Sequence, residues 1–207
     1  WVYGYNSDAE NAIVTDNSFY SIEEALKHVT ITNDPEIGAF AFSNADDILI
    51  VTINNTTIDL GEHAFAYSDR LTTVTFIDTE EKPCQISTIK TATFSDCIAL
   101  VMPTLPRSVK TIEDYVFYNC IFNPEFTVQN TVTSIGEYTF AFDEDHLESE
   151  LTTVNFLETC QISTISEGLF KNATSLEMHE LTILILFIIF RHQHIFNTDT
   201  MTALNIH

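Results

Sequence analysis

The chain has 207 residues and carries 30 acidic side chains against 8 Lys and Arg, which gives a formal net charge of -22. This charge balance argues against nucleic acid and anionic membrane surfaces as partners, because both are recognised by clustered basic side chains. Hydrophobic residues make up 45% of the sequence and Phe occurs 16 times. A disordered chain lacks such content, so the composition indicates a folded chain with a continuous core.

Phenylalanine recurs with a period of 23 residues, with two longer intervals, and an aliphatic residue precedes each copy by five positions. The six residues Cys84–Ile89 also occur again, unchanged, as Cys160–Ile165. A repeat of this length indicates a solenoid. The phenylalanines are Phe42, Phe65, Phe94, Phe117, Phe140 and Phe170, and the aliphatic residues are Ile37, Leu60, Ile89, Ile112, Ile135 and Ile165.

Along most of the sequence the phenylalanine is followed by apolar residues spaced by three and then by two positions, as in Leu71–Phe76 and Leu151–Phe156. Pro103, Asn123 and His179 are departures from this pattern. The alternation predicts one half-buried strand per coil, stacked into a parallel sheet with about 4.8 Å between coils. Short helical turns and loops are expected on the other sides, with the phenylalanines in a buried ladder. Pro103 replaces an apolar residue of one strand and predicts weaker pairing there.

The whole chain, residues 1–207, is therefore predicted to be a single array of about eight coils. Residues 13–181 follow the repeat regularly, whereas 1–12 and 182–207 form degenerate ends. Leu181–Phe190 is an apolar run of ten residues. Spanning a bilayer takes about 20 residues, so we interpret this run as a buried strand or core segment, and no membrane span is expected.

Val132–Phe140 and Leu105–Ile112 resemble BspA-like leucine-rich repeats, a family in which the phenylalanine is followed three positions later by a cysteine. Phe94 and Cys97 show this spacing, as do Phe117 and Cys120. The resemblance covers about residues 13–181 and implies a leucine-rich repeat solenoid. It also implies a non-enzymatic protein-binding or adhesion scaffold at the cell surface or outside the cell. An intracellular structural array in the cytoplasm is the alternative.

The candidate binding surface consists of the residues that point outward between the buried strand positions. Threonine suits an exposed strand, where its hydroxyl can pair with the next coil, so these residues could be purely structural. Solenoids also use such an extended concave surface to bind partners, here a protein or glycoprotein ligand. The residues are Ile50, Thr52, Thr73, Thr75, Met102, Thr104, Glu125, Thr127, Thr153 and Asn155.

No catalytic, cofactor or metal site is predicted. His179 and Glu180 lack the second histidine of a zinc helix, and Asp143–Asp145 lacks the glycine turn and distal glutamate of a calcium loop. Cys97 and Cys120 occupy equivalent buried positions in neighbouring coils, where a thiol acts as a small hydrophobic group and a disulfide between them is geometrically conceivable.

Three asparagines begin N-x-Ser/Thr sequons. Such asparagines are glycosylated only in a secreted chain, so the sequons are compatible with an extracellular location. The three asparagines are Asn54, Asn55 and Asn172.

Overall fold

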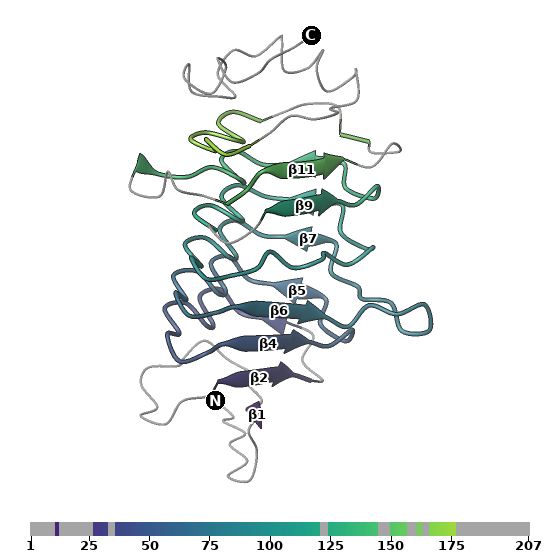
Figure 1. The fold of residues 1–207 in the computed structure, drawn as a ribbon. Coiled ribbons are helices and arrows are strands. Elements are labelled where there is room, and N and C mark those ends of the chain that lie inside the picture. Colours follow the sequence, from purple (N-terminus) through teal and green to yellow (C-terminus); the bar gives the residue numbers. More distant parts are fainter. Residues whose placement is uncertain are drawn as a thin grey trace.

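A computed structural model describes residues 11–12, 27–32, 36–120, 124–144, 150–156, 161–162 and 166–176. In these ranges the chain winds into coils that stack along one axis (Figure 1). Every strand pairing is parallel, and partners lie about one repeat apart, as in Ile50 with Thr73 and Thr111 with Ser134. The predicted solenoid is confirmed. The number of coils stays a prediction, because 182–207 and most of 1–12 lie outside the described residues.

One side of the solenoid is formed by the strands that the apolar alternation predicts (Figure 1). Their inward residues, such as Val29, Val51 and Val74, are buried, while threonines between them are exposed to varying degrees. The sheet has the order β1-β2-β4-β6, and a separate pair is formed by β9 and β11. These strands are β1 (Asn11–Ala12), β2 (His28–Ile31), β4 (Ile50–Ile53), β6 (Thr73–Phe76), β9 (Glu125–Val128) and β11 (Thr153–Phe156).

The sheet is interrupted between β6 and β9, where Pro103 lies. There the ladder shrinks to a single bridge between Thr73 and Val101, and the Val101 N–H donates to the Thr72 carbonyl. A proline has no N–H to donate, so a regular ladder cannot continue through this coil. The weaker pairing predicted at Pro103 is what the structure shows.

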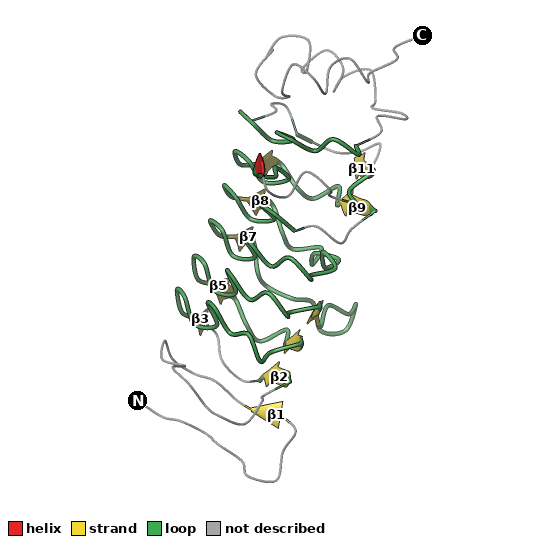
Figure 2. Ribbon diagram, turned by 60° about the vertical axis from the view of Figure 1, so that its left-hand side comes forward, coloured by secondary structure: helices red, strands yellow, loops and turns green. Residues whose placement is uncertain are grey.

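A second set of short strands lies on another side of the solenoid (Figure 2) and adds to the one strand per coil that the sequence predicts. Each ends at the aliphatic residue that precedes the phenylalanine. They are β3 (Glu36–Ile37), β5 (Asp59–Leu60), β7 (Thr88–Ile89), β8 (Thr111–Ile112) and β10 (Ser134–Ile135). Turns follow them, and no α-helix occurs in the described ranges.

The turns around each phenylalanine form their own hydrogen-bond ladder along the stack. The N–H of Phe42 donates to Ala64 O at 2.7 Å, and the N–H of Phe65 donates to Thr93 O at 2.9 Å. Within each turn, the N–H groups of the alternating residues bond locally instead, as Ala64 N–H donates to Gly61 O at 3.2 Å. The backbone is thereby paired without helix, which buried peptide groups require.

The phenylalanine side chains form the predicted buried ladder. Neighbouring rings from Phe42 to Phe170 lie 5.1 to 6.0 Å apart between centroids, with interplanar angles of 12° or less. Phe126 from β9 packs obliquely against Phe117 and Phe140, with centroids 5.3 and 5.1 Å away. Each interior ring therefore contacts the coils on both sides of it.

We expect Phe117→Ala to destabilise the chain by about 3–5 kcal/mol, the cost of a large-to-small change in a packed core. Phe117 is fully buried between Phe94 and Phe140. The matched control is Phe40→Ala, because Phe40 is 56% exposed and stacks on His63 at the surface. That change should cost about 1 kcal/mol or less. Denaturant unfolding measures both, and equal losses would contradict a core built on the phenylalanine ladder.

Candidate binding face

The strand face is the outward side of β2, β4, β6, β9 and β11, and strand register aligns its side chains in rows. Thr52 of β4 pairs with Thr75 of β6, and Asn155 of β11 pairs with Thr127 of β9. The structure leaves nine of the ten predicted residues exposed or partly exposed. They are Ile50, Thr52, Thr73, Thr75, Thr104, Glu125, Thr127, Thr153 and Asn155.

The prediction for Met102 is wrong, because this side chain is buried with 7% exposure. Val101 takes the outward position instead, with 57% exposure, and is bridged to Thr73. The repeat alignment places Met102 opposite Thr73, but the chain beside Pro103 is shifted by one residue. A one-residue shift exchanges inward and outward side chains. The proline was the signal for this irregularity, although it did not give the direction of the shift.

Several hydroxyls of the strand face are open to a partner. The threonine hydroxyls of Thr52, Thr75 and Thr127 make no hydrogen bond within the described part of the chain. By contrast, Thr72 Oγ1 donates to Leu49 O at 2.9 Å, and Thr152 Oγ1 donates to Pro124 O at 2.8 Å. The threonine that precedes a strand therefore joins coils, whereas the threonines on the face keep a donor and acceptor available.

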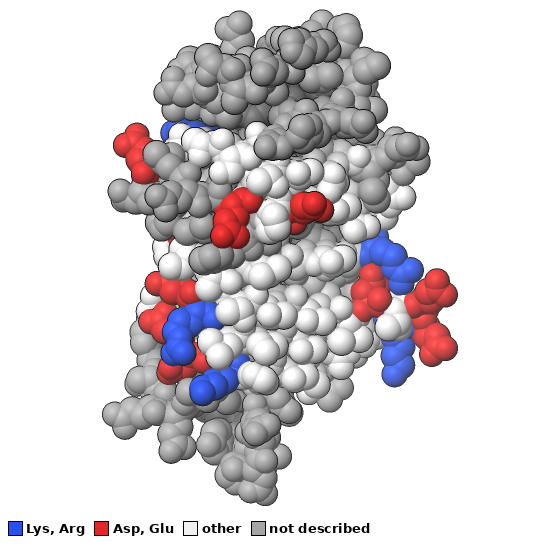
Figure 3. All heavy atoms as spheres, viewed as in Figure 1, with Lys and Arg blue, Asp and Glu red and all other residues white. Residues whose placement is uncertain are grey.

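Much of the strand face carries no charged side chain. In Figure 3 the surface over β4 and β6 is free of Lys, Arg, Asp and Glu, whereas charges gather along both flanks. Arg70, which precedes β6, pairs with Asp47 at 4.0 Å, and Asp78, which follows β6, pairs with Arg107 at 3.3 Å. Acidic atoms reappear near β9, where Glu125 is exposed. The lower half of the face is thus a neutral surface of hydroxyl and aliphatic groups.

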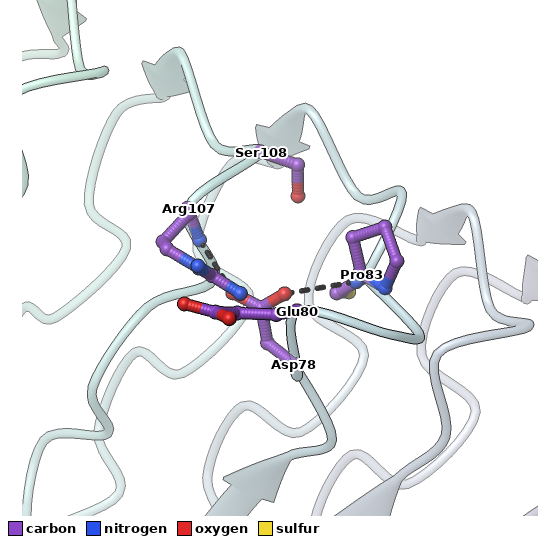
Figure 4. A pocket seen from close by; sticks show the side chains of 6 residues that line it. Asp78, Glu80, Pro83, Arg107 and Ser108 are labelled. Atoms are coloured by element: carbon purple, nitrogen blue, oxygen red, sulfur yellow. Dashed lines mark hydrogen bonds and ion pairs between the residues drawn. The ribbon is translucent and has the colours of Figure 1, made fainter.

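A hollow of about 430 Å³ lies beside the acidic loop that follows β6, between Asp78, Pro83, Cys84 and Arg107 (Figure 4). Asp78 accepts hydrogen bonds from the N–H groups of Cys84 and Arg107, at 3.0 and 2.9 Å, and from Arg107 Nε at 3.3 Å. Burial acts to raise the pKa of Asp78, but these hydrogen bonds and the guanidinium charge outweigh it and lower the pKa.

The thiols in the described residues are free and buried, so none is suited to nucleophilic chemistry. Burial raises the pKa of the Cys84 thiol, and raises that of Cys97 to about 12. Cys97 Sγ donates to Phe65 O at 3.0 Å, and Cys120 Sγ donates to Phe94 O at 3.2 Å. The conceivable Cys97–Cys120 disulfide is not formed in this structure, and Cys160 lies outside the described residues.

Within the described residues no helix is long and apolar enough to cross a membrane, and no group of three or more His, Cys, Asp or Glu is arranged to hold a metal ion. Leu181–Phe190, His179 and Asp145 lie outside those residues. Among the sequon asparagines, Asn172 is buried and its Nδ2 donates to Phe142 O at 2.8 Å. In the folded chain its amide is therefore closed to modification.

Parallel coils with a buried phenylalanine ladder and an outward row of strand residues define a leucine-rich repeat solenoid. The chain belongs to the family described as BspA type Leucine rich repeat region, whose sequence model matches six copies over residues 11–144 and 79–200. No curated protein matches the chain at a significant level.

Solved bacterial structures share this fold. A leucine-rich repeat protein from Bacteroides ovatus has a TM-score of 0.64 and 24% identity, covering 84% of this chain and 44% of its own length. A leucine rich cell surface protein from Faecalibacterium prausnitzii has a TM-score of 0.61 and 20% identity, with coverages of 85% and 51%. The T. pallidum leucine rich repeat protein has a TM-score of 0.59 and 18% identity, with coverages of 90% and 91%.

We expect Asp78→Asn to destabilise the chain by about 1–3 kcal/mol at neutral pH, because charge-assisted hydrogen bonds to a shielded carboxylate are weakened. Since folding lowers the pKa of Asp78, its stabilisation is complete above the unfolded value of about 3.9 and is lost as the pH falls through the folded value. Denaturant unfolding of both proteins should therefore show a constant difference from pH 7 to about 5, which shrinks below about pH 4.

Asp47→Asn is the control for this prediction, because the pair of Asp47 with Arg70 is exposed and long. Its loss should be about 0.5 kcal/mol or less at any pH. A difference between wild type and Asp78→Asn that stays unchanged below pH 4 would show that the Asp78 charge does not anchor the loop.

Proposed function

We propose that the chain is a non-enzymatic scaffold that binds a protein or glycoprotein partner through its strand face. The observation that carries this proposal is the neutral surface over β4 and β6, where aligned side chains present unpaired hydroxyls on a fully buried core. Such a surface is already ordered before binding, so association costs little conformational entropy. Family membership supports a repeat scaffold as the general class.

The chemistry of the face favours a partner that offers both hydrogen-bonding and apolar groups. Thr75 and Thr127 supply hydroxyls that both donate and accept, while Ile50 and Val101 add aliphatic contact area. Proteins and glycoproteins carry both kinds of group over an area that matches several coils. The buried, protonated thiols support a binding role over a catalytic one.

We further propose a location at the cell surface or outside the cell. This proposal rests on the similarity in fold to a protein described as a leucine rich cell surface protein. The alternative is a structural scaffold inside the cell, which the free thiols of Cys84, Cys97 and Cys120 favour, since a reducing compartment keeps thiols unpaired. Labelling of intact cells with a membrane-impermeant reagent separates the two locations.

Replacing Thr75, Thr104 and Thr127 together by Lys should abolish capture of a partner from cell-surface and matrix fractions. The three side chains are exposed, so the fold should lose only about 0.5 kcal/mol per site, with some added repulsion between stacked charges. Affinity capture with quantitative mass spectrometry measures the partner, and a thermal melt reports the fold.

The matched control is Glu80, Glu81 and Glu144→Gln, which changes the net charge equally but lies in exposed loops away from the strand face. This variant should keep the partner. Loss of the partner from the control, with retention by the lysine variant, would place binding on the acidic loops and overturn the assignment to the strand face.

A further inference from the structure

A cluster of tyrosines lies in the turns that follow β8 and β10. Figure 2 shows β8 on another side of the solenoid from β9 and β11. The rings of Tyr115 and Tyr138, from neighbouring coils, stack with centroids 5.1 Å apart and planes at 13°. Tyr118 meets Tyr115 edge-on, with centroids 5.5 Å apart and planes at 70°. Tyr115 is 38% exposed, so the cluster is open to solvent.

Carboxylates surround this cluster and make it electronegative. Burial, the neighbouring Tyr138 and the charges of Glu137, Asp114 and Glu167 together raise the pKa of Tyr115. The pKa of Tyr118 is also raised, first by burial and then by the charges of Asp143 and Asp96. Glu137 and Glu167 are exposed, and their carboxylates make no ion pair or hydrogen bond within the described residues. Their negative charge is therefore not compensated by these contacts.

The chain itself already places a cation on this cluster. Lys171 Nζ lies over the Tyr138 ring, 5.9 Å from its centroid, and the Lys171 side chain is exposed. The ring can take this position because Gly168 lies beneath it: a Cβ there would come within 2.3 Å of Tyr138 Cε1. Tyr138 is thus held between Tyr115, Gly168 and Lys171, with a positive charge over its face, an arrangement that is favourable for aromatic rings.

We propose that the tyrosine–carboxylate patch, formed by Tyr115, Tyr118, Tyr138, Glu137 and Glu167, binds a lysine- or arginine-rich segment of a partner protein. An incoming basic side chain replaces Lys171 over Tyr138, while Glu137 and Glu167 pair with the neighbouring positive charges. Charge complementarity identifies the occupant, because the patch combines uncompensated carboxylates with a ring that accepts a cation. The patch shares no residue with the strand face, so it is independent of the function proposed there.

The charge of the site disfavours a neutral carbohydrate. A neutral sugar would leave Glu137 and Glu167 unpaired and would not gain the attraction between a cation and the Tyr138 ring that Lys171 shows. The groups that remain open include exposed carboxylates. They suit an ammonium or guanidinium group, which donates several hydrogen bonds and carries the opposite charge.

The test uses fluorescence anisotropy of a labelled hepta-lysine peptide titrated with the full chain at low and at physiological salt. Wild type should bind saturably with one peptide per chain, and more weakly at higher salt because of screening. Tyr138→Leu should weaken binding about two- to fivefold. Glu137→Gln with Glu167→Gln should weaken it to a similar degree, and this variant changes only exposed groups, so folding is not at risk.

The distinguishing variant is Lys171→Met, which removes the competing internal cation and should strengthen binding about two- to fivefold. Lys82→Met is its control: it changes the net charge equally in a loop remote from the patch and should leave binding unchanged. Glu80→Gln with Glu81→Gln is the corresponding control for the acidic pair. Equal effects of patch and control variants, or no saturable binding by wild type, would overturn the proposal, because general charge attraction would then account for the peptide.

Discussion

The structure depends on hydrogen bonds that run along the stack from the turns around each phenylalanine. In the coils from Phe42 to Phe140, alternate N–H groups of the turn point toward the next coil and meet a carbonyl there, as Phe94 does with Val116 and Phe117 with Thr139, both at 3.1 Å. This ladder fixes the distance between coils and therefore the spacing of the phenylalanine rings. Isolated aromatic pairs prefer offset or edge-on contacts, so the near-parallel rings reflect the spacing that the backbone imposes.

Three of the residues that follow a phenylalanine by three positions add side-chain hydrogen bonds along the stack. Ser68 Oγ donates to Phe42 O at 2.9 Å, and the thiols of Cys97 and Cys120 donate to the corresponding carbonyls of Phe65 and Phe94. Ala45 and Ala173 occupy the same position without a side-chain donor, so this bond is not required in every coil. The cysteines of the repeat thus serve as buried hydrogen-bond donors, which accounts for their unpaired state without any redox role.

The buried part of the fold could be predicted from the sequence, because buried positions require apolar residues and these recur at fixed spacing. Phe117 and Ile112 have counterparts at the same spacing in the other repeats, and both residues are fully buried. The exchange of Met102 and Val101 could not be predicted, since both residues are apolar and Pro103 marks an irregularity without fixing its register. The short strands β3, β5, β7, β8 and β10 could not be predicted either, because two residues such as Thr111–Ile112 are too few to show an alternation.

The tyrosine–carboxylate patch escaped sequence analysis for a conformational reason. Tyr115 and Tyr138 adopt positive φ, at 58° and 54°, a region that bulky side chains avoid. Nothing in an aromatic residue predicts such a turn. The neighbouring coils place Ala92 and Gly168 at the equivalent position, so the turn does not require a tyrosine.

Hydrogen bonds between the turn backbones of neighbouring coils offset the free-energy cost of the positive φ angle. These bonds do not depend on which side chain points outward. Outward positions are consequently free to differ between coils. A single backbone ladder can therefore carry a neutral strand face on one side and an acidic aromatic patch on another. Both proposed binding surfaces therefore consist of residues that the repeat does not constrain.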